Sequence, residues 1–519
     1  MNLFSKKTYL TAIASVFVLF SYGQTATWAE DIAPILYAHC TTCHHTGGIG
    51  GFPLMTYAEA SVPYIDIAAA TQSRIMPPWK PDPNYRHFKD ENYLNQAQID
   101  KIADWVTNGK PQGNLANAPQ APVYNPVTQL ASIDKTVQIP SYTVSNNNDV
   151  YRTFVMTSGF SSPKYINQIE YLPGNPAIVH HVVFYYDPTQ TSFQYDNMDP
   201  GPGFGSYGVG PVANSAEWIG AWAPGQGPTI LPPNMGFLVP AGAYFAIEVH
   251  YAPGSQGLVD DTKVNLKYTT VTPVREVFTE PIMTHAGDML DGPLFIPANT
   301  VKTFHQANNA PNNDISMIGI FPHMHRVGSS YKVFNYQNTD TIPLIDIPSW
   351  DFHWQGYYTY QRLLQIKANS TFFGIATYDN TTNNPDNPSS PPQDVGEGEQ
   401  TTDEMMVAFI TYTNYQTGDE NVILDSTLLA TPISPAQKGR LFVYPNPAES
   451  VLYLRTEEMK GGTTAHLTLS SITGALIQEE TLTIGEKYHA ISIKSLNPGV
   501  YLLTLEGEQG KWVQKIVKN

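Results

Sequence analysis

The sequence predicts a multidomain, mainly β chain with a small α-helical domain near its N-terminus. Its 519 residues are enough for about three or four domains. Aromatic residues make up 12% of the chain and charged residues only 14%, while 38 glycines and 42 prolines supply many turns. This composition is typical of extracellular β-structure. Short stretches with helical spacing of apolar residues fall within residues 27–112.

Charge and cysteine content narrow the class of protein further. The net charge of −17 disfavours a nucleic-acid partner, because binding phosphates needs clustered lysine and arginine. The hydrophobic fraction of 42% is enough for packed cores. Cys40 and Cys43 are the two cysteines of the chain, so a disulfide framework is excluded and the β domains are disulfide-free.

Residues 1–26 are predicted to be a secretory signal peptide, and a retained N-terminal anchor is the alternative. Lys6 and Lys7 form its positive region, and the apolar run from Thr8 to Phe20 is too short to span a bilayer comfortably. Elsewhere no apolar run reaches about 18 residues, so we expect no transmembrane segment in the mature chain.

Turn signals and composition divide the remaining chain into five segments. Residues 98–106 have amphipathic helical spacing and are expected to close the first of them. Strand-like runs such as 182–186, 244–251 and 405–412, separated by turn formers, indicate β-sandwiches. The predicted segments are a helical domain at 27–112, a linker at 113–129, two β-sandwiches at 130–285 and 286–435, and an all-β unit at 439–519.

The stretch Cys40-Thr-Thr-Cys43-His44 has the Cys-x-x-Cys-His pattern of covalent haem attachment. The two thiols would bind the haem vinyl groups and His44 would supply one axial nitrogen to the iron. Export agrees with this prediction, because the attachment takes place outside the cytoplasm. The alternatives are a lone disulfide or a zinc site completed by histidines such as His39, His45 and His87.

Met76 is the candidate for the sixth haem ligand. It lies in Arg74-Ile-Met-Pro-Pro-Trp79, where two prolines stiffen the loop that presents the sulfur. Met55 and His87 are rival ligands, and a single methionine also serves to fill a core. With the helix at 98–107, the segment resembles a class I-type cytochrome c, and histidine–methionine ligation would suit electron transfer.

Five of the fourteen histidines lie in three settings within the β segments: His180-His181, His250, and His323 with His325. His323 and His325 are two residues apart, so on a strand both would point to one face. His180 and His181 are adjacent and would diverge on a regular strand. Both can therefore bind one metal ion only at a strand end or a β-bulge.

The strand at 244–251 is expected to carry its histidine away from the core. Phe245, Ile247 and Val249 would occupy one face, and His250 would share the other with Glu248 and look into a cleft. Neutral imidazoles suit copper, zinc, iron or nickel, and a thioether favours Cu(I). Structural histidines remain the alternative for a His-x-His pair taken alone.

The order of these motifs resembles the type II copper, ascorbate-dependent monooxygenases, the family of peptidylglycine α-hydroxylating monooxygenase and dopamine β-monooxygenase. The resemblance covers about residues 130–430. The matching stretches are Val179-His-His-Val182, Trp222-Ala-Pro-Gly225, Val249-His-Tyr251, Pro322-His-Met-His325 and Thr402-Asp-Glu-Met-Met406.

This resemblance implies two copper ions on two jelly-roll-like β-sandwiches that face one cleft. His180, His181 and His250 would hold an electron-transfer copper. His323, His325 and Met405 would hold the copper that reacts with O2, with Met405 preferred to Met406 because it directly follows Asp-Glu. The implied reaction is hydroxylation of a C–H bond of an unknown organic substrate.

The sequence also departs from this family. The peptide-processing member holds its substrate carboxylate with an arginine and a tyrosine at positions that are Phe321 and Phe409 here, so peptide amidation is not expected. Arg326 and Tyr412 are candidate polar contacts in the cleft or structural residues. The fused haem domain suggests that haem c supplies electrons to the copper core, tethered by the linker. An external electron donor or ascorbate would supply electrons to the haem.

The last segment contains Leu441-Phe-Val-Tyr-Pro-Asn-Pro-Ala448, Ser495-Leu-Asn-Pro-Gly-Val-Tyr-Leu-Leu503 and a final Gln514-Lys-Ile-Val-Lys-Asn519. It resembles the C-terminal sorting domain of the type IX secretion system, and an adhesion or carbohydrate-binding sandwich is the alternative. The resemblance implies export through the periplasm to the cell surface or medium, with the secretion machinery as a partner.

Four functions remain open from the sequence. The first is a secreted copper monooxygenase with a built-in haem donor, and the second is a copper oxidase or peroxidase that uses the same ligands. The third is a non-catalytic haem and copper electron-transfer or copper-binding surface protein. The fourth is a haem carrier with structural histidines.

Overall fold

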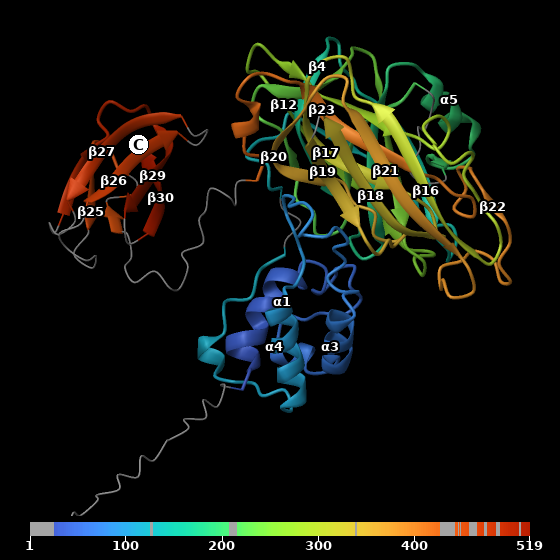
Figure 1. Ribbon diagram of the computed structural model, residues 1–519, viewed down its shortest axis with the longest axis horizontal. Helices are drawn as coiled ribbons and strands as arrows, with labels where there is room; N and C mark the ends of the chain where they lie inside the picture. The colour runs from blue at the N-terminus through green and yellow to red at the C-terminus, as the bar shows by residue number, and fades with distance from the viewer. Residues whose placement is uncertain are drawn as a thin grey trace, which may run out of the picture. The chain divides into compact units, whose positions relative to one another are not determined.

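The computed structural model shows a mainly β chain with a small helical part (Figure 1). It describes residues 25–124, 128–206, 215–337 and 340–425, and beyond these 442–444, 446, 448–455, 464–471, 475–483, 488–507 and 510–518. Nearly all of the predicted signal peptide lies outside the described residues. No helix in the described part of the chain is both long and apolar enough to cross a membrane.

The chain divides into two compact units. The smaller unit takes residues up to 46 together with 52–77 and 93–124, and the larger unit takes 47–51, 78–92 and the chain from 125 onward. Residues 78–92, which lie within the predicted helical domain, therefore belong to the unit that contains the β-sheets.

The smaller unit is helical, and its longest helix is the one that the sequence predicts. Helix α4 begins after Asn95, whose side chain forms a capping box with Gln98, and it buries Ile99, Ile102 and Trp105 along one face. The elements are η1 (Trp28–Ile32), α1 (Ala33–His39), α2 (Tyr57–Ala60), α3 (Tyr64–Gln72), α4 (Gln96–Thr107) and η2 (Leu115–Asn117).

The first β module consists of two larger sheets around one core. The core draws apolar side chains from both sheets, for example Phe154, Ile166, Phe245 and Leu266, so the sheets pack face to face. One sheet has the order β1-β12-β4-β9-β13 with β8 on β4, the other has the order β6-β3-β10-β5-β7, and β2 pairs with β11.

The bounds of these elements are β1 (Lys135–Gln138), β2 (Tyr142–Thr143), β3 (Val150–Thr157), β4 (Lys164–Leu172), β5 (Val179–Asp187), α5 (Thr191–Met198), β6 (Phe204–Gly205), β7 (Glu217–Trp222), β8 (Thr229–Ile230), β9 (Met235–Val239), β10 (Tyr244–Tyr251), β11 (Val259–Asp260), β12 (Lys263–Tyr268) and β13 (Arg275–Glu276).

The second β module repeats this arrangement with two four-stranded sheets. Their orders are β14-β23-β17-β20 and β16-β21-β18-β19, and a shared core again joins them. The bounds are β14 (Phe278–Met283), β15 (Phe295–Ile296), β16 (Thr300–Asn309), β17 (Ile315–His323), β18 (Gly328–Gln337), β19 (Asp340–Ile347), β20 (Tyr358–Ile366), β21 (Thr371–Asn380), β22 (Val395–Gly396), β23 (Val407–Asn414) and η3 (Asp419–Asn421).

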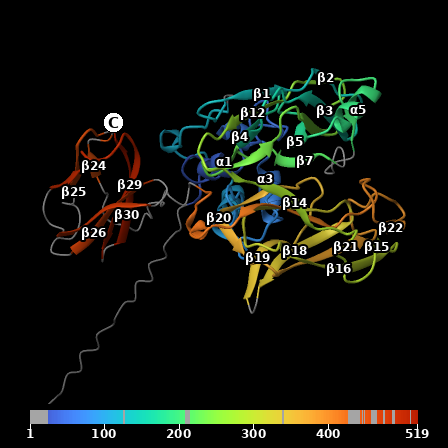
Figure 2. The same cartoon turned by 90° about the horizontal axis from the view of Figure 1, so that it is seen from above.

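The two β modules lie side by side (Figure 2). An aromatic cluster joins them. Trp218 of β7 lies 5.0 Å from the ring of Phe321 on β17 and 5.2 Å from the ring of Phe409 on β23, measured between ring centroids. Phe321 and Phe409 are also cross-strand partners. Burial of these large rings holds the facing sheets of the modules together.

Residues 78–92 pack on the second module. The ring of Trp79 lies 5.5 Å from that of Tyr358, and Phe88 stacks on Tyr360 at 5.5 Å. The Arg86 side chain donates from Nε to the carbonyl of Pro343 at 2.8 Å. The segment that begins two residues after Met76, at Pro78, is thus part of the β unit.

The C-terminal sheets form a third core of their own, which includes Leu452, Leu467, Leu503 and Ile516. The sheet orders are β24-β25-β28 and β27-β26-β29-β30. The bounds are β24 (Phe442–Tyr444), β25 (Val451–Arg455), β26 (Thr464–Ser471), β27 (Leu476–Thr483), β28 (Tyr488–Ser492), β29 (Gly499–Gly507) and β30 (Gly510–Lys518).

Candidate metal centres

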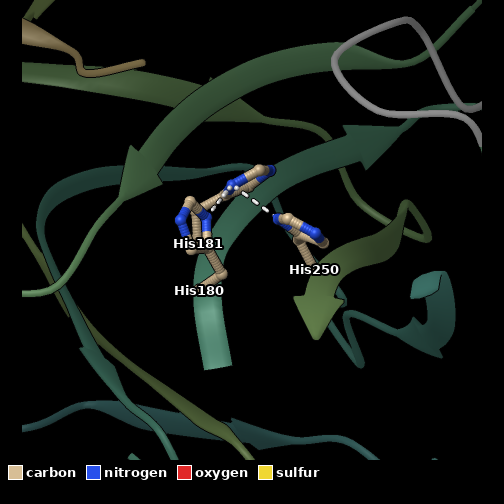
Figure 3. Close-up of side chains that lie close together, drawn as sticks. All are labelled: His180, His181 and His250. Carbon is tan, nitrogen blue, oxygen red and sulfur yellow. Dashed lines mark hydrogen bonds between the residues drawn. The ribbon is translucent and has the colours of Figure 1, made fainter. Parts of the chain in front are cut away.

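Three histidines from strands β5 and β10 converge in the first module (Figure 3). His250 on β10 is the cross-strand partner of His181 on β5, whereas Tyr251 pairs with Val179. His180 is therefore the extra residue of a β-bulge. The bulge turns two adjacent side chains toward one point, which is one of the two arrangements, a strand end or a β-bulge, that the sequence allows for a shared metal ion.

The ring nitrogens of this three-histidine cluster have the spacing of metal ligands. Nδ1 of His181 lies 3.3 Å from Nδ1 of His180 and 3.3 Å from Nδ1 of His250. Two nitrogens that each lie about 2.0 Å from a metal ion at a near-tetrahedral angle are about 3.3 Å apart. The cluster therefore fits a metal ion bound through three Nδ1 atoms.

Asp149 fixes the orientation of one of these rings. Its Oδ1 lies 2.7 Å from Nε2 of His250, which is 3% exposed, while the carboxylate is 39% exposed. A neutral His250 that donates from Nε2 to Asp149 keeps a lone pair on Nδ1, the atom that faces the other two histidines. Tyr151 stacks on a face of the same ring at 4.2 Å between centroids.

His323 and His325 converge at the end of β17 in the second module. The strand ends at His323, so His325 lies just beyond it, but the two ring centroids remain 5.0 Å apart. Nδ1 of His323 lies 2.6 Å from the amide oxygen of Gln355, and Nδ1 of His325 lies 3.0 Å from the carbonyl oxygen of Asp403. Both rings thus donate from Nδ1 and keep Nε2 for a metal ion.

An unsatisfied nitrogen supports the same interpretation. Nε2 of His323 is buried, and among the described residues it has no hydrogen-bond partner. A buried polar atom without a partner is rare in a folded protein and calls for a ligand, an ion or a water molecule. This site, the His-x-His site, therefore fits a metal ion bound through Nε2 atoms.

Glu404 connects the His-x-His site to the segment of Met405. Its fully buried carboxylate accepts hydrogen bonds from the backbone N–H of His325 at 2.9 Å and of Val327 at 2.7 Å. Burial raises the pKa of Glu404 to about 8, and these N–H donors offset part of that rise. The neighbouring Met405 is partly exposed, whereas Met406 is fully buried in the module core.

All five histidines line one small cavity of about 20 Å³, which has room for little more than one water molecule. Met405 is not among its lining residues in the described part of the chain. A second, larger cavity of about 550 Å³ shares four wall residues with it, namely Tyr151, Phe352, His353 and Thr401.

Burial keeps all five histidines in the form that binds metals. Burial lowers the pKa of His180 and of His323 to about 3, and it also lowers the pKa of His181, His250 and His325. Neutral imidazole is the ligand form, so near pH 7 no proton has to leave before a metal ion binds.

In the helical unit, the predicted haem-binding residues are compatible with covalent attachment. Cys40 and Cys43 are free thiols. Nδ1 of His44 lies 3.1 Å from the carbonyl oxygen of Phe52, which leaves Nε2 for an axial bond to iron. Met76 belongs to the same compact unit as these residues, whereas His87, the rival ligand, belongs to the other unit and pairs with Glu91 at 3.0 Å.

Several other predicted contacts differ in the structure. Tyr412 donates to Glu280 at 2.9 Å and lines neither cavity, whereas Arg326 lines the larger one. The alternation with His250 predicts that Glu248 looks into a cleft, and this prediction is wrong. Glu248 is fully buried, and this burial raises its pKa to about 8.

Three supporting residues were not anticipated from the sequence: Asp149, Gln355 and Glu404. Glu404 lies in the Asp-Glu-Met stretch, so its position next to a predicted ligand was a usable signal. Asp149 and Gln355 are 101 and 32 residues away from the histidines that they contact, and no local pattern links them.

Residues 442–519 match the family model described as the secretion system C-terminal sorting domain. The chain thus carries a type IX secretion sorting domain at its C-terminus, and it is exported to the cell surface or secreted. This domain implies interaction with the secretion machinery. A search of the curated proteins finds no match.

Solved structures resemble the chain only remotely. A biofilm-associated protein BSP domain is 8% identical, with 79% of this chain and 84% of that chain covered and a TM-score of 0.14. The infectious bursal disease virus VP2 subviral particle is 9% identical, with 58% and 76% covered and a TM-score of 0.17. A Salmonella alpha-2-macroglobulin mutant is 9% identical, with 74% and 33% covered and a TM-score of 0.13. Scores this low carry no argument about fold or function.

Proposed function

We propose that the protein is a secreted copper-dependent monooxygenase that hydroxylates a C–H bond with O2 and receives electrons through its own c-type haem. One observation carries this proposal: five histidines from two separate β modules, three of them buried and two half-buried, line a single cavity. When bound, copper would supply one-electron redox chemistry and activation of O2, and haem c would supply the electrons.

The proposal assigns electron transfer to one site and O2 binding to the other. The three-histidine cluster offers three nitrogens that Asp149 and the β-bulge hold in place, which suits a centre that exchanges electrons without changing its ligands. The His-x-His site offers two nitrogens, and Met405 is the third ligand that the family resemblance implies. Fewer fixed nitrogens leave a position open for a small molecule such as O2.

A specific observation favours the non-catalytic electron-transfer protein as the second candidate. The cavity between the histidines is about 20 Å³, too small for an organic substrate. The neighbouring cavity of about 550 Å³ favours an enzyme, because its volume suits a small-molecule ligand.

Reoxidation of the haem separates the two candidates without knowledge of the substrate. The full-length, copper-loaded protein is reduced anaerobically and mixed with O2, and the decay of the reduced haem absorbance is followed by stopped flow. The monooxygenase proposal expects fast reoxidation that both His181→Ala and His323→Ala slow strongly. The electron-transfer alternative expects dependence on His181 alone, and equal rates in all three proteins would contradict both.

A further inference from the structure

One charged side chain in the wall of the larger cavity has no ion-pair or hydrogen-bond partner among the described residues. Two arginines line it, Arg152 and Arg326. Arg152 is fully engaged, because it binds Asp199 at 2.7 and 3.0 Å and also donates to the carbonyls of Pro202 and Gly203. Within the described residues, the guanidinium of Arg326 makes no ion pair and no hydrogen bond, although this residue is partly buried.

A partly buried arginine without a partner favours an anionic ligand. A guanidinium presents a rigid set of donors that matches a carboxylate or sulfate group in two parallel hydrogen bonds. Asp149 is the acidic residue that lines the cavity, and its carboxylate is committed to His250 at 2.7 Å. Repulsion from Asp149 would direct the acid group of a ligand toward Arg326.

The rest of the wall offers neutral hydrogen-bonding groups. Gln400, Thr401 and Thr402 line the cavity from the turn that precedes Asp403, and their side chains have no hydrogen-bond partner among the described residues. Ser145 and Asn146 line it from the first module. Amides and hydroxyls of this kind pair with the hydroxyl groups of a polar ligand.

The cavity leads to the histidines. Phe352 belongs to both cavities, and its ring centroid lies 6.1 Å from that of His325. Arg326 directly follows His325 in the sequence. A molecule anchored on Arg326 would therefore extend along a wall that is shared with the His-x-His site.

We propose that this cavity binds a small organic monoanion rich in hydroxyl groups, the chemistry of an acidic sugar, with its acid group on Arg326. As an assignment of substrate class, the inference rests on the proposed monooxygenase function. Arg326 is the specificity-determining residue, and the 400–402 turn binds the hydroxyl groups.

Calorimetric titration of the full-length, haem-containing protein without added copper tests this site. Glucuronate is the probe, glucose is its uncharged counterpart, and inorganic sulfate is an anion without hydroxyl-bearing carbon. We expect glucuronate to bind at least tenfold more tightly than either control. We expect Arg326→Gln to weaken glucuronate binding at least tenfold while Arg362→Gln, which alters an exposed arginine on β20, leaves it unchanged.

Equal binding of glucuronate and glucose, unchanged binding in Arg326→Gln, or no binding of glucuronate at millimolar concentration would overturn the inference. Sulfate that binds as tightly as glucuronate would overturn its hydroxyl-rich part. If Arg326→Gln fails to fold, Arg326→Lys replaces it, with several-fold weaker binding expected because a lysine cannot make the paired contact. Copper content is measured separately, so loss of this site and loss of the monooxygenase proposal give different results.

Discussion

The two candidate metal centres use the same side chain in opposite ways. In the three-histidine cluster the rings face one another through Nδ1, and a carboxylate supports His250 from behind. At the His-x-His site the Nδ1 atoms bind the amide oxygen of Gln355 and the carbonyl oxygen of Asp403, and Nε2 of His323 has no hydrogen-bond partner among the described residues. A charged partner supports the first site, and neutral partners support the second.

This difference agrees with the different tasks that we propose for the two sites. A carboxylate behind a ligand makes the imidazole a stronger donor and fixes its orientation, which suits a centre that stays fully coordinated. Neutral partners leave the second pair of nitrogens less basic, and the geometry there provides two nitrogens rather than three. The contrast can be tested one site at a time.

Removal of a ligand gives the largest expected effect. His181→Ala and His323→Ala should each lose one copper ion per chain and keep the other. The loss should exceed the roughly 10- to 100-fold weakening that follows removal of a supporting partner. Metal analysis of the dialysed proteins measures it, with the exposed His305→Gln as the control that keeps both ions. Loss of both ions from either alanine variant would mean that the sites are not independent.

Removal of the supporting partners should weaken copper binding less than removal of a ligand does, and by different amounts at the two sites. Asp149→Asn should weaken copper binding at the three-histidine cluster about 10- to 100-fold, because the carboxylate holds His250 in the ligand tautomer. Gln355→Leu should weaken the His-x-His site less, because it removes a neutral hydrogen bond. Competition titrations with a copper chelator measure both affinities, and a larger effect for Gln355→Leu would reverse our comparison of the sites.

The dependence of stability on pH gives the smallest effect. Burial lowers the pKa of His180 and His323 to about 3 in the folded protein, against about 6.5 in an unfolded chain. Below pH 6.5 the unfolded chain binds more protons, so the copper-free protein loses stability as the pH falls toward 3. Each such histidine contributes at most about 1.4 kcal/mol per pH unit.

Thermal unfolding between pH 7.5 and 5 checks this prediction. His180→Gln and His323→Gln should each flatten the decline in melting temperature, and His305→Gln, at an exposed position, should not. A decline that stays equally steep in the His180→Gln and His323→Gln variants would show that the folded protein does not hold these imidazoles in the neutral form.

Strand periodicity predicted some parts of the site correctly, although it was wrong for Glu248. It placed Phe245, Ile247 and Val249 in the core. It required a strand end or a bulge at His180-His181, and the pairing of β5 with β10 contains a bulge there. Contacts between distant segments could not be predicted in this way. The position of Gln355 depends on a turn before β20, and residues 78–92 pack on the second module through aromatic rings with no local signal.

The composition of the two sites is tested most directly by counting metal ions in the full-length protein matured in a haem-competent periplasm. Wild-type protein should hold two copper ions and one haem iron per chain. His323→Ala should hold one copper ion, and Met405→Ala should bind its second copper more weakly. Iron without copper, even after reconstitution, would contradict the account and leave the five histidines as structural residues.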